Sequence, residues 1–188
     1  MMKYYKLCMD FKRENDIIAH YYNDYGIGQN RLNSGIYYKN WDQKFSFYYD
    51  KTEGETTSDY LANDKGWFVV SEKLKNLLTV LNTEIQFLPV RVKEKNSKKI
   101  HNYFIANVLT VLDALCLEKS DYFETEIPSI GKIYTVSKFA VCERKIEGAD
   151  VFKLANRQEI PIFVSQRFKA MVEKNSITGI GFWEIKVI

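Results

Sequence analysis

Histidine is scarce in this chain of 188 residues, which contains only His20 and His101. Neither has a partner at a metal-ligand spacing such as H-x-x-x-H. The glycine-rich phosphate-binding motifs and the G-x-S-x-G nucleophile motif are absent as well. We therefore expect a protein that is not an enzyme and that has no catalytic residues, no metal site and no cofactor.

Cysteines and long apolar runs are equally limited. The three cysteines, Cys8, Cys116 and Cys142, are odd in number and widely spaced, which argues against a disulfide framework and fits a reducing cytoplasm. Lys6 and Asp10 interrupt the N-terminal segment, so it does not resemble a secretory signal. No stretch approaches the roughly 18 apolar residues of a membrane helix. The sequence predicts a cytoplasmic protein without a membrane partner.

Glycine and proline are few, at 9 and 3 residues, which excludes low-complexity and collagen-like chains. The 27 basic residues nearly balance the 24 acidic ones, and this net charge of +3 gives no reason to expect nucleic acid. The chain is instead rich in apolar and aromatic residues, with 46% hydrophobic residues, 13 Tyr and 12 Phe. That is enough for one sizeable core, and residues 1–188 are predicted to form a single domain.

Residues 1–66 are expected to form an N-terminal region of strands and loops. The alternation in residues 2–11 predicts a half-buried strand, with Tyr5, Leu7, Met9 and Phe11 on one side. Residues 16–22 predict either a short strand or a helical turn, and residues 45–49 predict another strand. Polar and glycine-bearing composition predicts loops at residues 23–40 and 50–66.

Residues 67–188 are expected to form a core with two similar strand-helix-strand units, at residues 67–93 and 160–188. In the first unit an apolar strand precedes Ser71, a favourable helix N-cap. The leucines that follow, at positions 74, 77, 78 and 81, form one helix face. Ser165 has the same place in the second unit. Two explanations stay open: a duplicated unit with pseudo-symmetric surfaces, or two similar solutions to one packing problem.

Further strands are predicted from alternation at residues 84–93, 102–111, 131–145, 150–154 and 182–188. The polar segment 95–99 predicts a hairpin turn between the first two of them. Together these patterns predict an α/β or α+β fold: a single domain with a mixed, mostly antiparallel sheet and two short helices.

Three clusters of side chains are candidates for binding. Carboxylates gather in residues 50–64, either as a solvated loop or as an acidic contact surface. Basic residues gather in residues 91–99, where they protect a strand edge and a hairpin tip or, alternatively, bind nucleic acid. Aromatic residues gather in residues 21–49 among Asn, Gly and Gln. Part of this last set must be core, and tyrosine on such loops is also typical of binding surfaces.

Several short motifs resemble one known family. They are Asp59 to Ser71, Asn107-Val108-Leu109 with Asp113-Ala114-Leu115, Phe152-Lys153-Leu154, Ile162 to Ser165 with Phe168-Lys169, and Ile177-Thr178-Gly179. As a set they are similar to the immunity proteins of bacterial polymorphic toxin systems, in the family typed by a myxobacterial protein. The resemblance covers roughly residues 45 to 188. By themselves these motifs are strands, a cap, helix faces and a turn, so they mark a fold better than a site.

The resemblance implies a non-enzymatic protein that binds a cognate toxin domain in the producing cell and blocks it. From the loop composition, the candidate toxin contacts are Tyr22, Tyr25, Trp41, Asp50 and Asp59. Two other functions compete with this one. A small carboxylate-based, metal-dependent hydrolase would use Asp59, Asp64 and Asp113, and a nucleic-acid-binding module would use the hairpin at residues 91–99. The sequence leaves open whether the chain forms a homodimer.

Overall fold

The computed structural model describes residues 2–10, 12–41, 44–129, 131–156, 158 and 160–188. The helices are α1 (Gln29–Asn33), α2 (Glu72–Leu78) and α3 (Gln166–Lys174), with short 3-10 turns at Leu117–Lys119 and Glu143–Lys145. The first strands are β1 (Tyr4–Met9), β2 (Ile18–Ala19), β3 (Ser46–Tyr49), β4 (Tyr60–Asn63), β5 (Val69–Val70), β6 (Ile85–Glu94) and β7 (Ile100–Val108). The others are β8 (Val111–Leu112), β9 (Asp121–Ile127), β10 (Gly131–Lys138), β11 (Ala140–Val141), β12 (Val151–Leu154), β13 (Ile162–Ser165), β14 (Ile180–Glu184) and β15 (Lys186–Val187).

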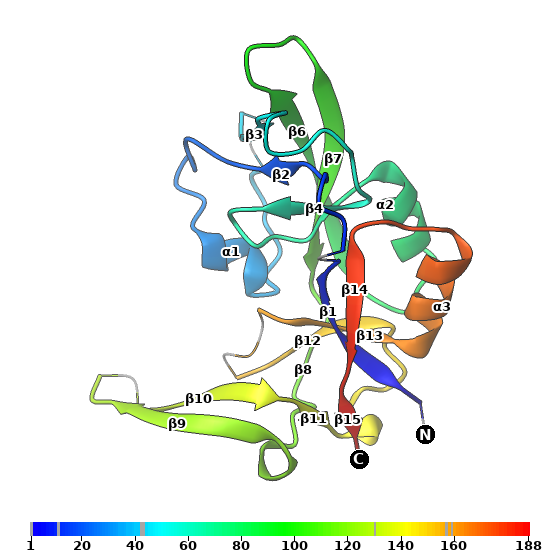
Figure 1. Cartoon of the computed structure of the whole chain (residues 1–188). Helices are drawn as coiled ribbons and strands as arrows, with labels where there is room; N and C mark the ends of the chain where they lie inside the picture. The colour runs from blue at the N-terminus through cyan, green and yellow to red at the C-terminus, as the bar shows by residue number, and fades with distance from the viewer. Residues whose placement is uncertain (1, 11, 42–43, 130, 157, 159) are drawn as a thin grey trace.

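A six-stranded sheet forms one half of the molecule, in the order β2-β4-β5-β7-β6-β3 (Figure 1). Its two outer strands also meet each other, because His20 and Tyr48 exchange backbone hydrogen bonds of 2.7 Å. The sheet therefore nearly closes on itself around an apolar interior. Among the large side chains there, the rings of Phe45, Phe47 and Trp67 contact one another.

A five-stranded sheet, in the order β14-β1-β13-β12-β8, forms the other half. Residues on one face, such as Tyr5 and Val164, pack in the cluster that includes α2 and α3. Residues on the opposite face, such as Tyr4 and Phe163, pack in a second cluster with Val141 and its neighbours. Strand β1 is therefore buried on both faces at its start, at Tyr4 and Tyr5, whereas Lys6 and Cys8 on the Tyr4 side are only partly buried, in line with the predicted half-buried strand. Phe11, predicted on the same strand, lies outside the described residues.

The two predicted strand-helix-strand segments have the same topology. Strands β5 and β6 are each antiparallel to β7 and flank it, with α2 between them in sequence. Strands β13 and β14 flank β1 in the same way, with α3 between them. Ser71 and Ser165 are the helix N-caps, accepting hydrogen bonds from the backbone N–H groups of Leu74 and Phe168. These caps and helix faces confirm the corresponding sequence predictions.

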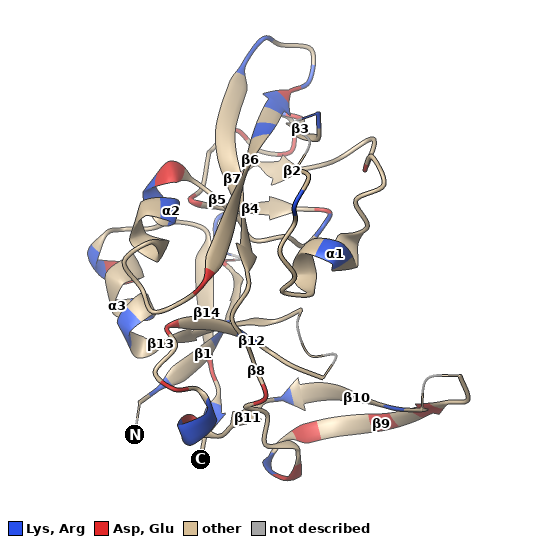
Figure 2. Ribbon diagram, turned by 180° about the vertical axis from the view of Figure 1, so that it is seen from behind, with Lys and Arg blue, Asp and Glu red and all other residues tan. Residues whose placement is uncertain are grey.

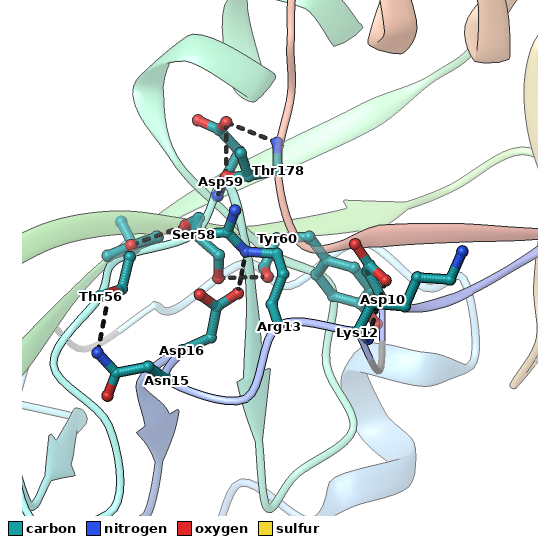
Figure 3. A network of polar contacts seen from close by, with 11 residues as sticks. Asp10, Lys12, Arg13, Asn15, Asp16, Thr56, Ser58, Asp59, Tyr60 and Thr178 are labelled. Atoms are coloured by element: carbon teal, nitrogen blue, oxygen red, sulfur yellow. Dashed lines mark hydrogen bonds and ion pairs between the residues drawn. The ribbon is translucent and has the colours of Figure 1, made fainter.

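The equivalence of the two units extends to the polar contacts that join them. The carboxylate of Asp59 accepts hydrogen bonds from the hydroxyl of the α2 cap, Ser71 (2.6 Å), and from the N–H of Thr178 beyond α3 (2.9 Å; Figure 3). The carboxylate of Asp150 accepts them from the α3 cap, Ser165 (2.6 Å), and from the N–H of Asn82 beyond α2 (3.0 Å). Asp59 thus joins the start of α2 to the segment after α3, and Asp150 joins the start of α3 to the segment after α2. We call these two sets of contacts the aspartate clamps.

The basic side chains two residues after each cap also bond to the segment near the end of the other helix. Lys73 Nζ donates to the carbonyl of Ser176 near the end of α3. Arg167 Nη2 donates to the carbonyl of Val80 near the end of α2. Together with the aspartate clamps, these contacts join the two units reciprocally, since each helix start is bonded to the segment after the other helix. Both explanations, a duplicated unit and two similar solutions to one packing problem, stay open.

The structure confirms a mixed α+β fold made mostly of strands, and it adds elements that the sequence patterns missed. A third helix, α1, lies within the predicted loop 23–40, and β4 lies within the predicted loop 50–66. Helix α1 has no side-chain N-cap. Its C-terminal carbonyls are instead bound by the buried ammonium of Lys153, 2.7 Å from the oxygen of Asn33. A long-range contact of this kind leaves no local sequence signal.

Strand β9 is the third addition, since the sequence patterns predict only its partner strand, within residues 131–145. It pairs with β10 to form a two-stranded arm that projects from the body (Figure 1). Nearly every residue of β9 is exposed, including Phe123 at 72%. We call this hairpin, residues 121–138, the arm. After the arm, β11 pairs in parallel with β15 at the C-terminal end.

Candidate functional site

Closure of the six-stranded sheet brings together side chains from four segments. The His20–Tyr48 bridge places residues 20–22 beside the end of β3. Strand β3 pairs in parallel with β6, and this pairing sets Tyr48 opposite Lys93. We call the resulting group the closure surface; its members are His20, Tyr22, Tyr48, Asp50, Glu53, Asp64, Lys93 and Lys95.

Aromatic rings and lysines alternate across the closure surface. The Tyr22 and Tyr48 rings lie 4.9 Å apart between centroids, and Tyr22 is 66% exposed. Lys93 Nζ lies 5.5 Å from the Tyr48 ring, and Lys95 Nζ lies 5.8 Å from the Tyr22 ring. Cations at this range are attracted to the ring faces. The pKa of Lys95 is raised, chiefly by the Tyr22 hydroxyl and then by the nearby carboxylates.

Asp50 completes this part of the surface. Its carboxylate lies 3.8 Å from Lys95 Nζ and accepts hydrogen bonds from the backbone and side chain of Thr52. The Thr52 bonds and, to a smaller extent, Lys95 lower the pKa of Asp50. The side chain is therefore an anion held in place beside a cation and an exposed tyrosine, which is a geometry suited to contact with another protein.

His20 joins two acidic segments at the other side of the closure surface. Its Nε2 lies 2.7 Å from Glu53 and its Nδ1 lies 3.0 Å from Asp64. Partial burial lowers the pKa of His20, but hydrogen bonds and charge interactions with the two carboxylates outweigh it, and the net direction is upward. In its protonated form His20 links β2, the 50–56 turn and the end of β4.

We expect His20→Gln to reduce stability in mildly acidic solution and to have little effect in alkaline solution. Because the folded-state pKa of His20 is raised, its contribution is complete below the unfolded value of about 6.5 and is lost as pH rises through the folded value. These side chains are partly exposed, so the effect should stay below about 1 kcal/mol. Urea unfolding at about pH 5.5 and pH 9 measures it. An equal loss at both pH values would contradict an ionic role for His20.

The structure brings together only some of the residues predicted to contact a toxin. Tyr22 and Asp50 lie on the closure surface, on either side of Lys95. Tyr25 lies on the loop before α1 and is exposed. Trp41 is half-buried and donates from Nε1 to the carbonyl of Pro89. Asp59 lies in the aspartate clamp at the start of α2, so its carboxylate is already engaged by three donors: the Ser71 hydroxyl and, as Figure 3 shows, the N–H and hydroxyl of Thr178.

The toxin contacts predicted from the sequence do not include His20, Tyr48 or Glu53, although the last two lie in the predicted aromatic and acidic clusters. Lys93 and Lys95 are part of a separate predicted basic cluster. The basic segment 91–99 shows no interleaved aromatics along the chain. The aromatics come instead from β3 and from residue 22, across the sheet. The alternation of residues 45–49 predicts the strand β3. No local sequence pattern indicates that β3 pairs with β6.

The model of the Immunity protein family (Imm11) matches residues 3–187. The chain belongs to this family. The match includes residues 3–45, which the motif resemblance does not cover, and therefore takes in β1, β2 and α1. No curated protein matches the chain at a significant level of sequence similarity.

Membership of an immunity protein family suggests a non-enzymatic role. The three carboxylates considered for a hydrolase lie in separate environments. Asp59 is in a clamp, Asp64 faces His20, and Asp113 pairs with Lys145 and Asn156. Within the described ranges, no group of three or more His, Cys, Asp or Glu side chains is arranged to hold a metal ion. The hydrolase alternative therefore gains no geometric support.

The alternative of a nucleic-acid module rests on the hairpin of β6 and β7, which the structure contains as predicted. Two of its lysines, Lys93 and Lys95, face the tyrosines and a carboxylate of the closure surface. Figure 2 shows basic residues at the hairpin tip and also on α1, α2 and α3, not gathered on one element. In the described part of the chain, no helix is long and apolar enough to cross a membrane.

Proposed function

We propose that this immunity family member binds a cognate toxin domain inside the producing cell and neutralises it by forming a stoichiometric complex. The observation that carries the proposal is the closure surface, where the exposed Tyr22, the partly buried Tyr48, both signs of charge and ordered side chains meet. No catalytic step is required of such a protein, because occupying the toxin is sufficient to block it.

The chemistry of the closure surface favours protein recognition. Tyrosine supplies a large contact area at low cost in side-chain entropy, and it is enriched at interfaces. Tyr22 is the most exposed aromatic of the group. The ion pairs with His20 and Lys95 fix the surrounding loops before binding, and a preorganised surface loses less entropy when a complex forms. Asp50 and Lys95 offer complementary charge for orientation of the partner.

The other predicted contacts have different relations to this surface. Tyr25 extends it on the loop that follows Tyr22, and we include Tyr25 among the direct contacts. Trp41 and Asp59 are already bonded within the protein, so we assign them supporting positions around the interface. The acidic members Asp50, Glu53 and Asp64 give the surface more carboxylates than lysines, which suits a toxin domain with a basic face.

The direct test begins with affinity purification of the tagged protein from its native host and identification of bound proteins by mass spectrometry. The C-terminal domain of a recovered multidomain protein is then expressed in a heterologous bacterium, with and without this chain. The proposal expects growth arrest by that domain alone and rescue at near-equal stoichiometry. A recovered protein whose toxicity is unaffected by the chain would contradict the proposal.

Tyr22→Ala is expected to weaken the complex with that toxin domain by about 30-fold or more, the effect of a central interface tyrosine. Asp50→Ala should weaken it less, mainly by slowing association. Tyr37→Ala is the matched control, because Tyr37 is similarly exposed and lies outside the closure surface. Surface plasmon resonance measures all three. Equal affinities for the Tyr22 and Tyr37 variants would move the interface elsewhere on the molecule.

A further inference from the structure

A groove of about 350 Å³ lies where the arm joins the C-terminal strands, and neither the clamps nor the closure surface includes it. Strand β10 and the residue after it form one wall, and the end of β14 with the start of β15 forms the other. The lining residues are Lys6, Lys119, Asp121, Ser137, Lys138, Phe139, Trp183, Glu184, Ile185 and Lys186. The arm lies at the opposite end of the molecule from β2 and β3 (Figures 1 and 2).

The groove has an excess of positive charge that the protein itself does not neutralise. Its two carboxylates are already paired: Asp121 lies 2.9 Å from Lys138, and Glu184 lies 3.0 Å from Lys3. The remaining lining cations are Lys6, Lys119 and Lys186. Among the described residues none of these three has a carboxylate partner. Three lysines around one concave site attract an anionic ligand.

An exposed indole accompanies these lysines. Trp183 is 57% exposed, whereas Trp67 is fully buried, and Lys6 Nζ lies 4.3 Å from the Trp183 ring. An exposed tryptophan in a hollow is a frequent anchor of protein interfaces. Strand β14, which bears Trp183, has a bonded neighbour on one side only, because it ends the five-stranded sheet. Such an edge can pair with an added strand.

We propose that this groove binds an acidic, extended segment of a partner protein. Carboxylates of the segment pair with Lys6, Lys119 and Lys186, and an apolar side chain packs on Trp183. Backbone groups of the segment pair with the open edge of β14. A protein segment fits better than nucleic acid, because the backbone N–H and C=O groups of an extended segment can pair with the open edge of β14 and a phosphate backbone cannot add a strand there. This site is independent of the closure surface.

The first test uses a fluorescein-labelled peptide of alternating glutamate and leucine residues and measures its anisotropy with the full-length protein. We expect saturable binding that weakens as salt increases. The double variant Lys119→Glu/Lys186→Glu should weaken binding by about tenfold or more. Lys98→Glu/Lys99→Glu at the β6–β7 tip changes the net charge equally and should leave binding unchanged. Equal loss in both variants would show a nonspecific charge effect and overturn the proposal.

The second test uses tryptophan fluorescence, because Trp183 is the most exposed of the three tryptophans. Binding of an unlabelled form of the peptide should shift the emission to shorter wavelength, and Trp183→Phe should remove that shift. A shift that persists in Trp183→Phe would place the peptide elsewhere. A single-stranded oligonucleotide that competes with the peptide at equal concentration would overturn the choice of a protein segment. Neither result depends on the toxin, so failure here leaves the proposed function intact.

Discussion

Asp150→Ala is expected to lower the free energy of unfolding by about 3–4 kcal/mol, because it leaves buried donors without partners. The Asp150 carboxylate accepts hydrogen bonds from Ser165 Oγ, from the N–H of Asn82 and from Arg167. Removing it releases the serine that caps α3 from its partner and frees the segment after α2. The variant should therefore weaken the packing of both helices on their shared core.

Chemical denaturation monitored by circular dichroism measures this effect. Asp59→Ala, in the more exposed clamp, should cost less, about 1–3 kcal/mol. Asp113→Ala is the control, since its ion pair with Lys145 is on the surface and should contribute below about 1 kcal/mol. If the Asp150 and Asp113 variants were equally stable, the clamp would not hold the two units together.

Trp67→Ala should destabilise the protein by about 3–5 kcal/mol, the usual range for loss of a large buried aromatic side chain. Trp67 is 1% exposed and lies inside the closed sheet, where its ring contacts Phe45 and Phe47. Its Nε1 also donates to the carbonyl of Gln29 at the start of α1, 3.0 Å away. Removing the indole leaves a cavity and frees α1 from one of its attachments.

The same denaturation measurement with Trp67→Phe separates the two contributions. Phenylalanine keeps most of the apolar volume but cannot donate to Gln29, so its cost should be roughly half that of alanine. Trp183→Phe is the control, because that indole is exposed. A Trp67→Ala variant as stable as Trp183→Phe would show that the closed sheet does not depend on this side chain.

Amino-acid composition identified some residues of the candidate site but not the contacts between them. Tyr22 and Asp50 are candidates because tyrosine and acidic residues on polar loops are typical of interfaces. Their relation to each other through Lys95 is not visible in the sequence, since it depends on the parallel pairing of β3 with β6. Asp59 is a candidate for the same compositional reason, but its carboxylate is bonded to Ser71 and Thr178. Composition cannot distinguish an exposed carboxylate from one that joins two helices.

The sequence by itself determined the elements whose signal is local. The caps at Ser71 and Ser165, the leucine face of α2 and the β6–β7 hairpin follow from patterns that span a few residues. Only the tertiary structure decided what joins distant segments: closure of the sheet at His20 and Tyr48, and the reciprocal aspartate clamps. Local patterns reflect helix and strand periodicity, which each segment carries alone. Contacts between distant residues depend instead on which surfaces the folded chain brings together, and no local periodicity records that choice.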